Sequence, residues 1–180
     1  SLYGQTSWSE SDRQTLVAEL NRTEQLVLKE TAGLSPQQWT FRESPARWSI
    51  AEIVEHLGLQ EDMYFREISL VAAQPPQPAY QDKVKGNDAR VLAYATDPEA
   101  GQASWLLQPK GRWRDPGQAV DAFSYSRHQL TDFVRTTKVN FREHFTFRTY
   151  SGNQNQWSVR DLHQLMLTTV AHTERHVAQI

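Results

Sequence analysis

The stretch that decides the fold reads SIAEIVEHLGLQEDMYFREISLVAA and covers residues 49–73. Ser49 and Glu52 match a capping box, in which a hydroxyl and a carboxylate accept hydrogen bonds from the unpaired backbone N–H groups of a helix start. Apolar side chains then recur every three or four positions, as on one face of an amphipathic helix. They are Ile50, Ile53, Val54, Leu57, Tyr64, Phe65, Ile68 and Val71. Prolines follow at positions 75, 76 and 78, so we predict one long helix that ends at about Ala73.

Three more segments carry a helical pattern. One runs from about Ser9 to Ala32 and has serines that can cap its start. Another starts at Asp115-Pro116, a cap residue followed by a proline suited to the first helical turn. The last begins at Ser158 and is expected to run to the end of the chain. Long helices without convincing strands predict an all-α four-helix bundle, built as a single domain over residues 1–180.

The connections between these helices are predicted to differ in length and in structure. Ser35 to Trp39 indicates a single helical turn. Pro75 to Arg114 gives a weaker signal, with a short helix at about Ala89 to Ala95, and its length predicts a crossover rather than a tight hairpin. Asn140 to Asn155 is expected to be a polar loop with a turn at Ser151-Gly152-Asn153.

Composition restricts the class of partner. Nineteen basic and 21 acidic residues give a net charge of −2, which provides no basic footprint for nucleic acid and no polybasic membrane patch. No apolar run approaches the roughly 20 residues that cross a bilayer. Cysteine is absent, which excludes disulfides, thiolate zinc sites, iron–sulfur clusters and cysteine nucleophiles. We therefore expect a small-molecule substrate rather than nucleic acid or a membrane.

The cellular location is the least constrained property. A cytoplasmic protein is expected, because no signal peptide is visible. The sequence starts at Ser1 rather than at methionine, so an exported form with a removed signal stays open.

Two histidines of the last helix have the spacing of metal ligands. At 100° per residue, His176 lies about 40° and His172 about 80° from Leu162, on one flank of the core-facing side. Residues four apart on a helix have Cβ atoms roughly 5–6 Å from each other, which lets two imidazoles converge on one ion. His163 points about 180° away from His172 and is expected to be partly exposed.

A third ligand must come from another element, and His56 is the best candidate. It lies in the middle of the 49–73 helix, on the flank of the apolar stripe. His128 and His144 are less attractive, because one lies near a polar stretch and the other in a loop. Geometry alone does not choose firmly among them, and buried histidines that donate to backbone carbonyls are the alternative to a metal site.

Other metal templates fail on spacing. A zincin needs glutamate directly after the first histidine, whereas Glu174 is two residues after His172 and points toward solvent. Di-iron bundles need a glutamate three residues before a histidine, and Ile53 and Thr173 occupy those positions.

No acid–base pair is evident beside the histidines. Glu61 lies in the apolar stripe and is a weak candidate for a general base or for an acceptor that orients a ligand imidazole. The favoured interpretation is a helix residue that rotates out to an edge of the bundle or pairs with an arginine. Gln179 lies on the His172 flank, where it could hydrogen-bond a ligand or cover the helix end.

Two motifs resemble a known family. WSIAEIVEHL, residues 48–57, looks like the helix-two motif of the DinB-like, YfiT-like superfamily, and AHTERHVAQI, residues 171–180, looks like its helix-four motif. Segments 109–113 and 140–144 also resemble connecting segments of that family. The agreement in order and spacing covers nearly the whole chain.

The resemblance implies a four-helix bundle that binds one divalent metal ion through three histidines, which match His56, His172 and His176. Three imidazoles accept zinc, nickel, copper or iron, and we expect zinc or nickel. Members characterised as enzymes are chiefly thiol-dependent transferases and isomerases that use bacillithiol, mycothiol or glutathione, and many others are described as metal-dependent hydrolases. The family and an aromatic-rich surface also make a homodimer an expectation.

These observations predict an enzyme that transfers a low-molecular-weight thiol to an electrophile. Because the chain has no cysteine, the sulfur must come from a small-molecule thiol as co-substrate. Metal-dependent hydrolysis is the alternative, and a non-catalytic metal-binding or stress-related module is a third interpretation.

Overall fold

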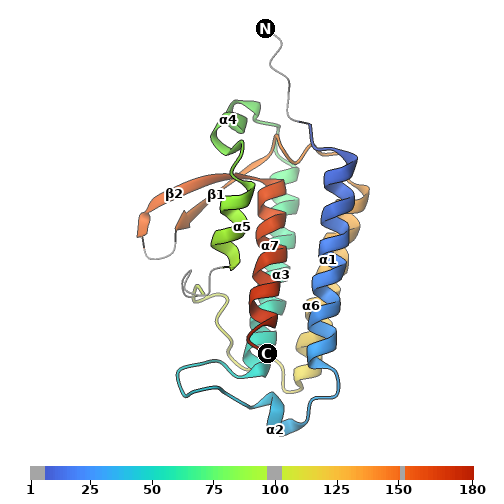
Figure 1. Ribbon diagram of the computed structural model, residues 1–180, viewed down its shortest axis with the longest axis vertical. Helices are drawn as coiled ribbons and strands as arrows, with labels where there is room; N and C mark the ends of the chain where they lie inside the picture. The colour runs from blue at the N-terminus through green and yellow to red at the C-terminus, as the bar shows by residue number, and fades with distance from the viewer. Residues whose placement is uncertain (1–6, 97–102, 151–152) are drawn as a thin grey trace.

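Four long capped helices build the body of the molecule (Figure 1). The computed structural model describes residues 7–96, 103–150 and 153–180. The long helices are α1 (Glu10–Thr31), α3 (Ile50–Ala72), α6 (Pro116–Thr136) and α7 (Leu162–Val177). The structure thus confirms the predicted four-helix bundle, with the 49–73 helix at its centre as α3.

Local capping explains where three of these helices begin. The Ser49 hydroxyl accepts from the Glu52 backbone N–H, and the Glu52 carboxylate accepts from the Ser49 N–H, which completes the predicted capping box. Ser9 does the same with Asp12 at the start of α1. The Asp115 carboxylate caps α6 through the Gly117 N–H, with proline in the first turn.

The order of the helices around the bundle differs from their order in the chain. Both α1 and α3 pack against α6 and α7. In Figure 1, α1 and α7 run downward, whereas α3 and α6 run upward. The connection from α3 to α6 therefore travels the length of the bundle, as the long crossover of the sequence prediction requires.

Short helices occupy the connections. The turn after α1 is α2 (Pro36–Trp39), capped by Ser35 as predicted. The crossover contains the 3₁₀ helix η1 (Pro78–Tyr80), α4 (Gln81–Val84) and α5 (Asp88–Thr96). Helix α5 matches the short helix expected at residues 89–95 and packs against α7.

A β-hairpin precedes α7, where the sequence predicted a polar loop. Strand β1 (Phe145–Tyr150) pairs antiparallel with β2 (Asn153–Asp161), and Phe145 lies opposite Asp161. Residues 145–150 read FTFRTY, a run of aromatic and β-branched types that favours a strand. The predictions of an Asn140–Asn155 loop and of no strands are therefore wrong. Of the expected turn, residues 151 and 152 lie outside the described ranges.

The start of α7 also needs correction. Ser158 lies in β2 opposite Arg148, so the helix does not begin there. Its cap is Asp161, whose carboxylate accepts from the Gln164 N–H at 2.7 Å. The Ser158-to-Asp161 spacing resembles a capping box, but strand pairing takes the backbone of the first residue.

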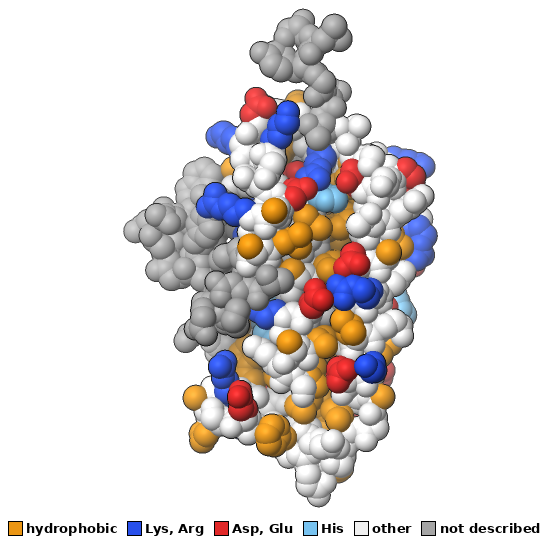
Figure 2. Space-filling model, viewed as in Figure 1, with side chains coloured by type: hydrophobic (Ala, Val, Ile, Leu, Met, Phe, Trp, Pro, Cys, Tyr) orange, Lys and Arg blue, Asp and Glu red, His pale blue; other side chains and the backbone are white. Residues whose placement is uncertain are grey.

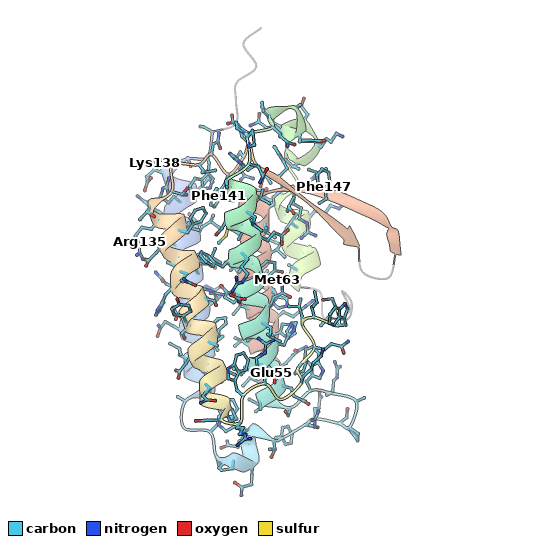
Figure 3. All side chains as sticks on the ribbon, turned by 180° about the vertical axis from the view of Figure 1, so that it is seen from behind. Glu55, Met63, Arg135, Lys138, Phe141 and Phe147 are labelled. Carbon is cyan, nitrogen blue, oxygen red and sulfur yellow. The ribbon has the colours of Figure 1, made fainter. Side chains whose placement is uncertain are left out.

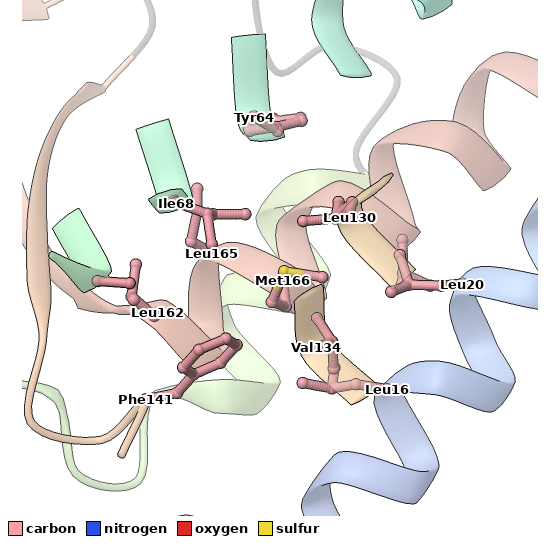
Figure 4. Close-up of a cluster of buried hydrophobic side chains, with 12 residues drawn as sticks. Leu16, Leu20, Tyr64, Ile68, Leu130, Val134, Phe141, Leu162, Leu165 and Met166 are labelled. Atoms are coloured by element: carbon pink, nitrogen blue, oxygen red, sulfur yellow. The ribbon is translucent and has the colours of Figure 1, made fainter. Parts of the chain in front are cut away.

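The apolar core has an upper and a lower part, in the orientation of Figure 1. The upper cluster lies between the four long helices (Figure 4) and includes Leu16, Leu20, Tyr64, Ile68, Leu130, Val134, Phe141, Leu162, Leu165 and Met166. A lower cluster comprises Val27, Ile53, Leu57 and Phe123. On the surface, Figure 2 shows acidic and basic side chains interspersed over one face. Among the described residues, no helix is both long and apolar enough to cross a membrane.

Candidate metal centre

Three buried histidines meet between α3 and α7 in the lower half of the bundle. They are His56 on α3 and His172 with His176 on α7, with exposed fractions of 2%, 8% and 6%. One ring nitrogen from each lies within 4.8 Å of the other two. The Nε2 atoms of His56 and His172 are 3.2 Å apart. The structure thus brings together the three residues that the sequence selected.

Helix geometry and one tryptophan explain this convergence. His172 and His176 are one turn apart on α7, and their ring centroids are 4.5 Å from each other. Helix α3 packs antiparallel to α7 and places the His56 ring 4.7 Å from that of His176. Trp48, just before the α3 cap, lies 5.0 Å from the His56 ring and 6.4 Å from the His176 ring. The indole ring of Trp48 therefore borders the cluster.

Two of the imidazoles have a fixed tautomer. The Nδ1 of His56 donates to the Leu107 carbonyl oxygen at 2.8 Å, because that oxygen can only accept. The Nδ1 of His176 donates to the Gln179 side-chain oxygen at 2.7 Å, so Gln179 orients a ring of the cluster as the sequence allowed. Each ring then presents the lone pair of Nε2, the form in which imidazole binds a metal.

The three rings are uncharged at neutral pH. Burial lowers the pKa of His176 to about 3, with the charges of His56 and Arg175 acting in the same direction. Burial likewise holds the pKa of His172 well below its ordinary value, followed by the effect of the other two histidines. The pKa of His56 is also lowered by burial, against the opposing effect of its bond to the Leu107 carbonyl. Neutral imidazoles bind a metal ion more readily than protonated ones. Because the His56 Nε2 carries no proton, the His172 Nε2–H donates to it at 3.2 Å, and that proton must leave Nε2 before this atom can bind a metal.

Glu61 is committed to a buried ion pair beside the histidines. Arg127, which is fully buried, donates to both carboxylate oxygens of Glu61. The same guanidinium donates to the Leu20 carbonyl and the Thr23 hydroxyl at 2.7 Å each, and to the Thr173 hydroxyl at 2.8 Å. This polar layer joins all four long helices. Of the two alternatives that the sequence left open for Glu61, the structure shows the arginine pair rather than an exposed edge position.

Glu55 is a functional candidate that the sequence reasoning missed. It is 5% exposed, and its carboxylate accepts from the backbone N–H groups of Lys110, Gly111 and Arg112 at 2.8–3.3 Å (Figure 3). Gly111 has φ of +68°, a left-handed conformation that helps three successive N–H groups face one acceptor. A glutamate directly before a candidate ligand, in a helix with a buried flank, is the signal that could have revealed it.

The other histidines lie outside the cluster. His128 is exposed, with Nε2 3.0 Å from the Glu24 carboxylate, and His144 lies in a loop with Nδ1 3.2 Å from the Val71 carbonyl. The prediction that His163 is partly exposed is wrong, because it is 6% exposed. Its Nδ1 accepts from the Trp8 indole N–H at 3.1 Å. The segment before α1 covers this position, which a helical wheel does not reveal.

A positive charge lies beside His176. A guanidinium nitrogen of Arg175 lies 3.5 Å from the Nε2 of His176. Glu174 points outward and pairs with Arg22 at 3.2 Å, which agrees with the predicted orientation. Within the described ranges, the three histidines are the group of ligand-type side chains close enough to share an ion. Three neutral nitrogen donors with no carboxylate suit zinc, nickel, copper or iron rather than magnesium or calcium.

Comparison with known proteins agrees with this architecture. A family model described as the DinB superfamily matches residues 19–180. The chain belongs to the DinB superfamily. Among solved structures, this DinB-superfamily chain is similar to YfiT from Bacillus subtilis, with a TM-score of 0.63 and 13% sequence identity over 100% of this chain and 90% of that one. The published description of YfiT is "a probable metal-dependent hydrolase with an unusual four-helix bundle topology". No curated protein sequence matches the chain.

Proposed function

We propose that this protein is a metal-dependent enzyme whose centre is one divalent ion, zinc or nickel, held by His56, His172 and His176. The observation that carries the proposal is the meeting of three buried, neutral imidazoles whose ligand nitrogens lie within 4.8 Å of one another. Nitrogen ligands of a tetrahedral ion are about 3.4 Å apart when each bond is about 2.1 Å, so the rings must move closer together to share one ion. Three protein ligands leave a coordination position open, which distinguishes a catalytic from a structural site.

Charge favours an anionic nucleophile at this position. The imidazoles are neutral, Arg175 adds a positive charge, and the carboxylates of Glu61 and Glu55 are already engaged. A divalent ion would lower the pKa of a water molecule or a thiol bound to it. Because the chain has no cysteine, a sulfur nucleophile would be a small-molecule thiol.

The reaction we propose is transfer of that thiol to an electrophile. The thiol loses its proton to solvent, its sulfur forms a bond to the electrophilic carbon, and the bond from that carbon to the leaving group breaks, so that the leaving group departs with the electron pair. Trp48 borders the histidines, which are themselves buried. Arg175 stands beside His176, where it can attract the anionic form of the nucleophile.

Hydrolysis at the same centre is the second candidate. It needs the same three ligands, with water in place of the thiol. The description of YfiT as a metal-dependent hydrolase favours it, because that structure shares this fold.

The test combines metal content with two activities. Protein purified without a histidine tag is assayed by elemental analysis, then for loss of glutathione or cysteine with an aryl halide and for hydrolysis of a nitrophenyl ester. We expect about one metal ion per chain, and loss of metal and turnover in His172→Ala. The exposed His128 supplies the matched control, His128→Ala, which should keep both.

The outcomes separate the candidates. Turnover of the thiol but not of the ester supports transfer, and the reverse result supports hydrolysis. Full turnover in a folded His172→Ala variant would overturn the enzymatic proposal. Bound metal with neither activity, and a large fall in melting temperature on chelation, would instead indicate a structural metal site.

A further inference from the structure

One loop of the α3–α6 connection is tied to α3 through two consecutive residues. Glu55 accepts from the N–H groups of residues 110–112, and His56 donates to the carbonyl of Leu107. The two loop positions are only three residues apart. A displacement of the 110–112 backbone therefore also moves the Leu107 carbonyl, because so short a piece of chain has little slack.

The Glu55 carboxylate makes a strong attachment. It is buried, and a charged acceptor with three N–H donors forms hydrogen bonds stronger than neutral ones. Without the carboxylate, the three N–H groups would lose their acceptor and would turn toward water. The loop around Lys110 and Gly111 is exposed, so water can reach them once the attachment is broken.

The Leu107 carbonyl in turn decides which nitrogen of His56 carries the proton. The bond of 2.8 Å from Nδ1 keeps the proton there and leaves Nε2 without one. The Nε2 atom is the one that faces the Nε2 of His172, at 3.2 Å. If the carbonyl moves away, the ring can adopt the other tautomer, in which Nε2 carries the proton and is no longer a ligand.

We propose that Glu55 is a positioning residue for the metal centre. It acts through the 107–112 loop and fixes the tautomer and the orientation of His56. The role in metal binding rests on the proposed function, whereas the role in fixing the tautomer does not.

The test uses three variants that remove a carboxylate at two positions of α3. Glu55→Ala breaks the attachment, and Glu55→Gln keeps one acceptor oxygen. Glu52→Ala is the matched control, because it removes the capping carboxylate and the Arg42 pair near the start of α3 without touching the 107–112 loop. All variants are labelled with ¹⁵N-histidine and studied first in the presence of chelator.

The first readout is the tautomer of His56 in metal-free protein, from long-range ¹H–¹⁵N NMR spectra. We expect the Nδ1–H tautomer in the unmodified chain and in Glu52→Ala, and a mixture of tautomers in Glu55→Ala. Glu55→Gln should be intermediate. His176 serves as an internal reference, because its Nδ1 partner is Gln179 rather than the loop.

The second readout is the binding of Co²⁺, followed by its visible absorption. Loss of a residue that orients a metal ligand typically weakens binding on the order of 10- to 100-fold, and we expect Glu55→Ala to fall in that range with an altered spectrum. Glu52→Ala should lower the melting temperature with less than a twofold change in Kd.

The proposal fails if the His56 tautomer in Glu55→Ala is the same as in the unmodified chain. It fails equally if the Co²⁺ affinities of the Glu55 and Glu52 variants change alike. If Glu55→Ala does not fold, Glu55→Gln decides by the same criteria. An unmodified chain that binds no metal would contradict the proposed function, and the NMR measurement would then still decide the role of Glu55.

Discussion

At the residue scale, the side chain that most directly opposes a cation in the histidine cluster is Arg175. Its guanidinium lies 3.5 Å from the His176 Nε2, and it lowers the pKa of all three histidines after the larger effect of burial. A positive charge that disfavours a protonated ring also disfavours a metal ion on that ring. A positive charge at residue 175 therefore weakens metal binding but attracts an anionic nucleophile.

Replacement of Arg175 should strengthen metal binding. At a separation of about 5 Å and an effective dielectric constant close to that of water, the repulsion between one positive charge and a divalent ion amounts to roughly 1–2 kcal/mol. We expect Arg175→Gln to lower the Kd for Zn²⁺ about 5- to 30-fold in competition titrations with a chromophoric chelator. Arg66→Gln, which removes an exposed arginine paired with Asp62, is the control and should leave the Kd unchanged. Weaker binding in Arg175→Gln would show that the arginine supports the site.

His163 predicts a pH dependence of stability. Burial and the nearby Arg142 lower its pKa from 6.5 to about 4, against the opposing charges of Asp88 and Asp12. The unfolded chain therefore binds more protons than the folded chain between these values, so stability falls as pH decreases from 6.5 toward 4. The contribution of His163 is up to about 3 kcal/mol, at 1.36 kcal/mol per pKa unit.

Urea unfolding at several pH values, with chelator present, measures this contribution. His163→Gln keeps an acceptor for the Trp8 indole but does not titrate. Its free energy of unfolding should decrease less steeply below pH 6.5 than that of the unmodified chain. Parallel pH curves for the two proteins would contradict the assignment.

At the scale of the elements, the histidine-bearing parts of α3 and α7 could be predicted from the sequence, but what covers them could not. A four-residue spacing and an apolar stripe place His56, His172 and His176 on flanks of helices. The hairpin before α7 was missed because the spacing of Ser158 and Asp161 imitates a helix start. The roles of Glu55 and His163 depend on a loop and a terminal segment that contact them only in the folded chain.

The Arg127 layer holds the four long helices at one level. Removing one partner of a buried ion pair typically costs about 3–5 kcal/mol, because the other charge remains buried. We expect Arg127→Met to lose about this much stability in urea unfolding. The double variant Arg127→Met with Glu61→Leu should lose clearly less than the sum of the two single variants. Additive losses would show that Arg127 and Glu61 act independently.

The cap of α7 provides a second test at this scale. Asp161 accepts from the Gln164 N–H and also pairs with Arg142 at 3.0 Å. Asp161→Ala should therefore cost at least the roughly 1 kcal/mol of a typical cap, with more from the lost ion pair. Ser158→Ala, at the start predicted from the sequence, should cost less than Asp161→Ala by thermal unfolding, because residue 158 lies in β2 and not at the helix start. A larger loss at Ser158 than at Asp161 would favour the earlier helix start.

At the scale of the whole molecule, the apolar clusters are built from side chains outside the histidine cluster. Apolar clusters above and below the Arg127 layer join α3 and α7 through their neighbours. We therefore expect chelation to leave the far-ultraviolet circular dichroism spectrum unchanged and the unfolding cooperative, with a lower melting temperature. Collapse of the helical signal on chelation would mean that metal binding and folding are the same event.

The fully buried arginine has a consequence for how this sequence can change. Its five donors specify one axial alignment of the surrounding helices, as a lone polar position does in a coiled coil. Substitutions in the upper cluster, away from Tyr64, whose ring centroid lies 6.2 Å from that of His172, can then alter side-chain volumes without shifting the three imidazoles. Part of the upper core could therefore be redesigned while the three imidazoles keep their positions.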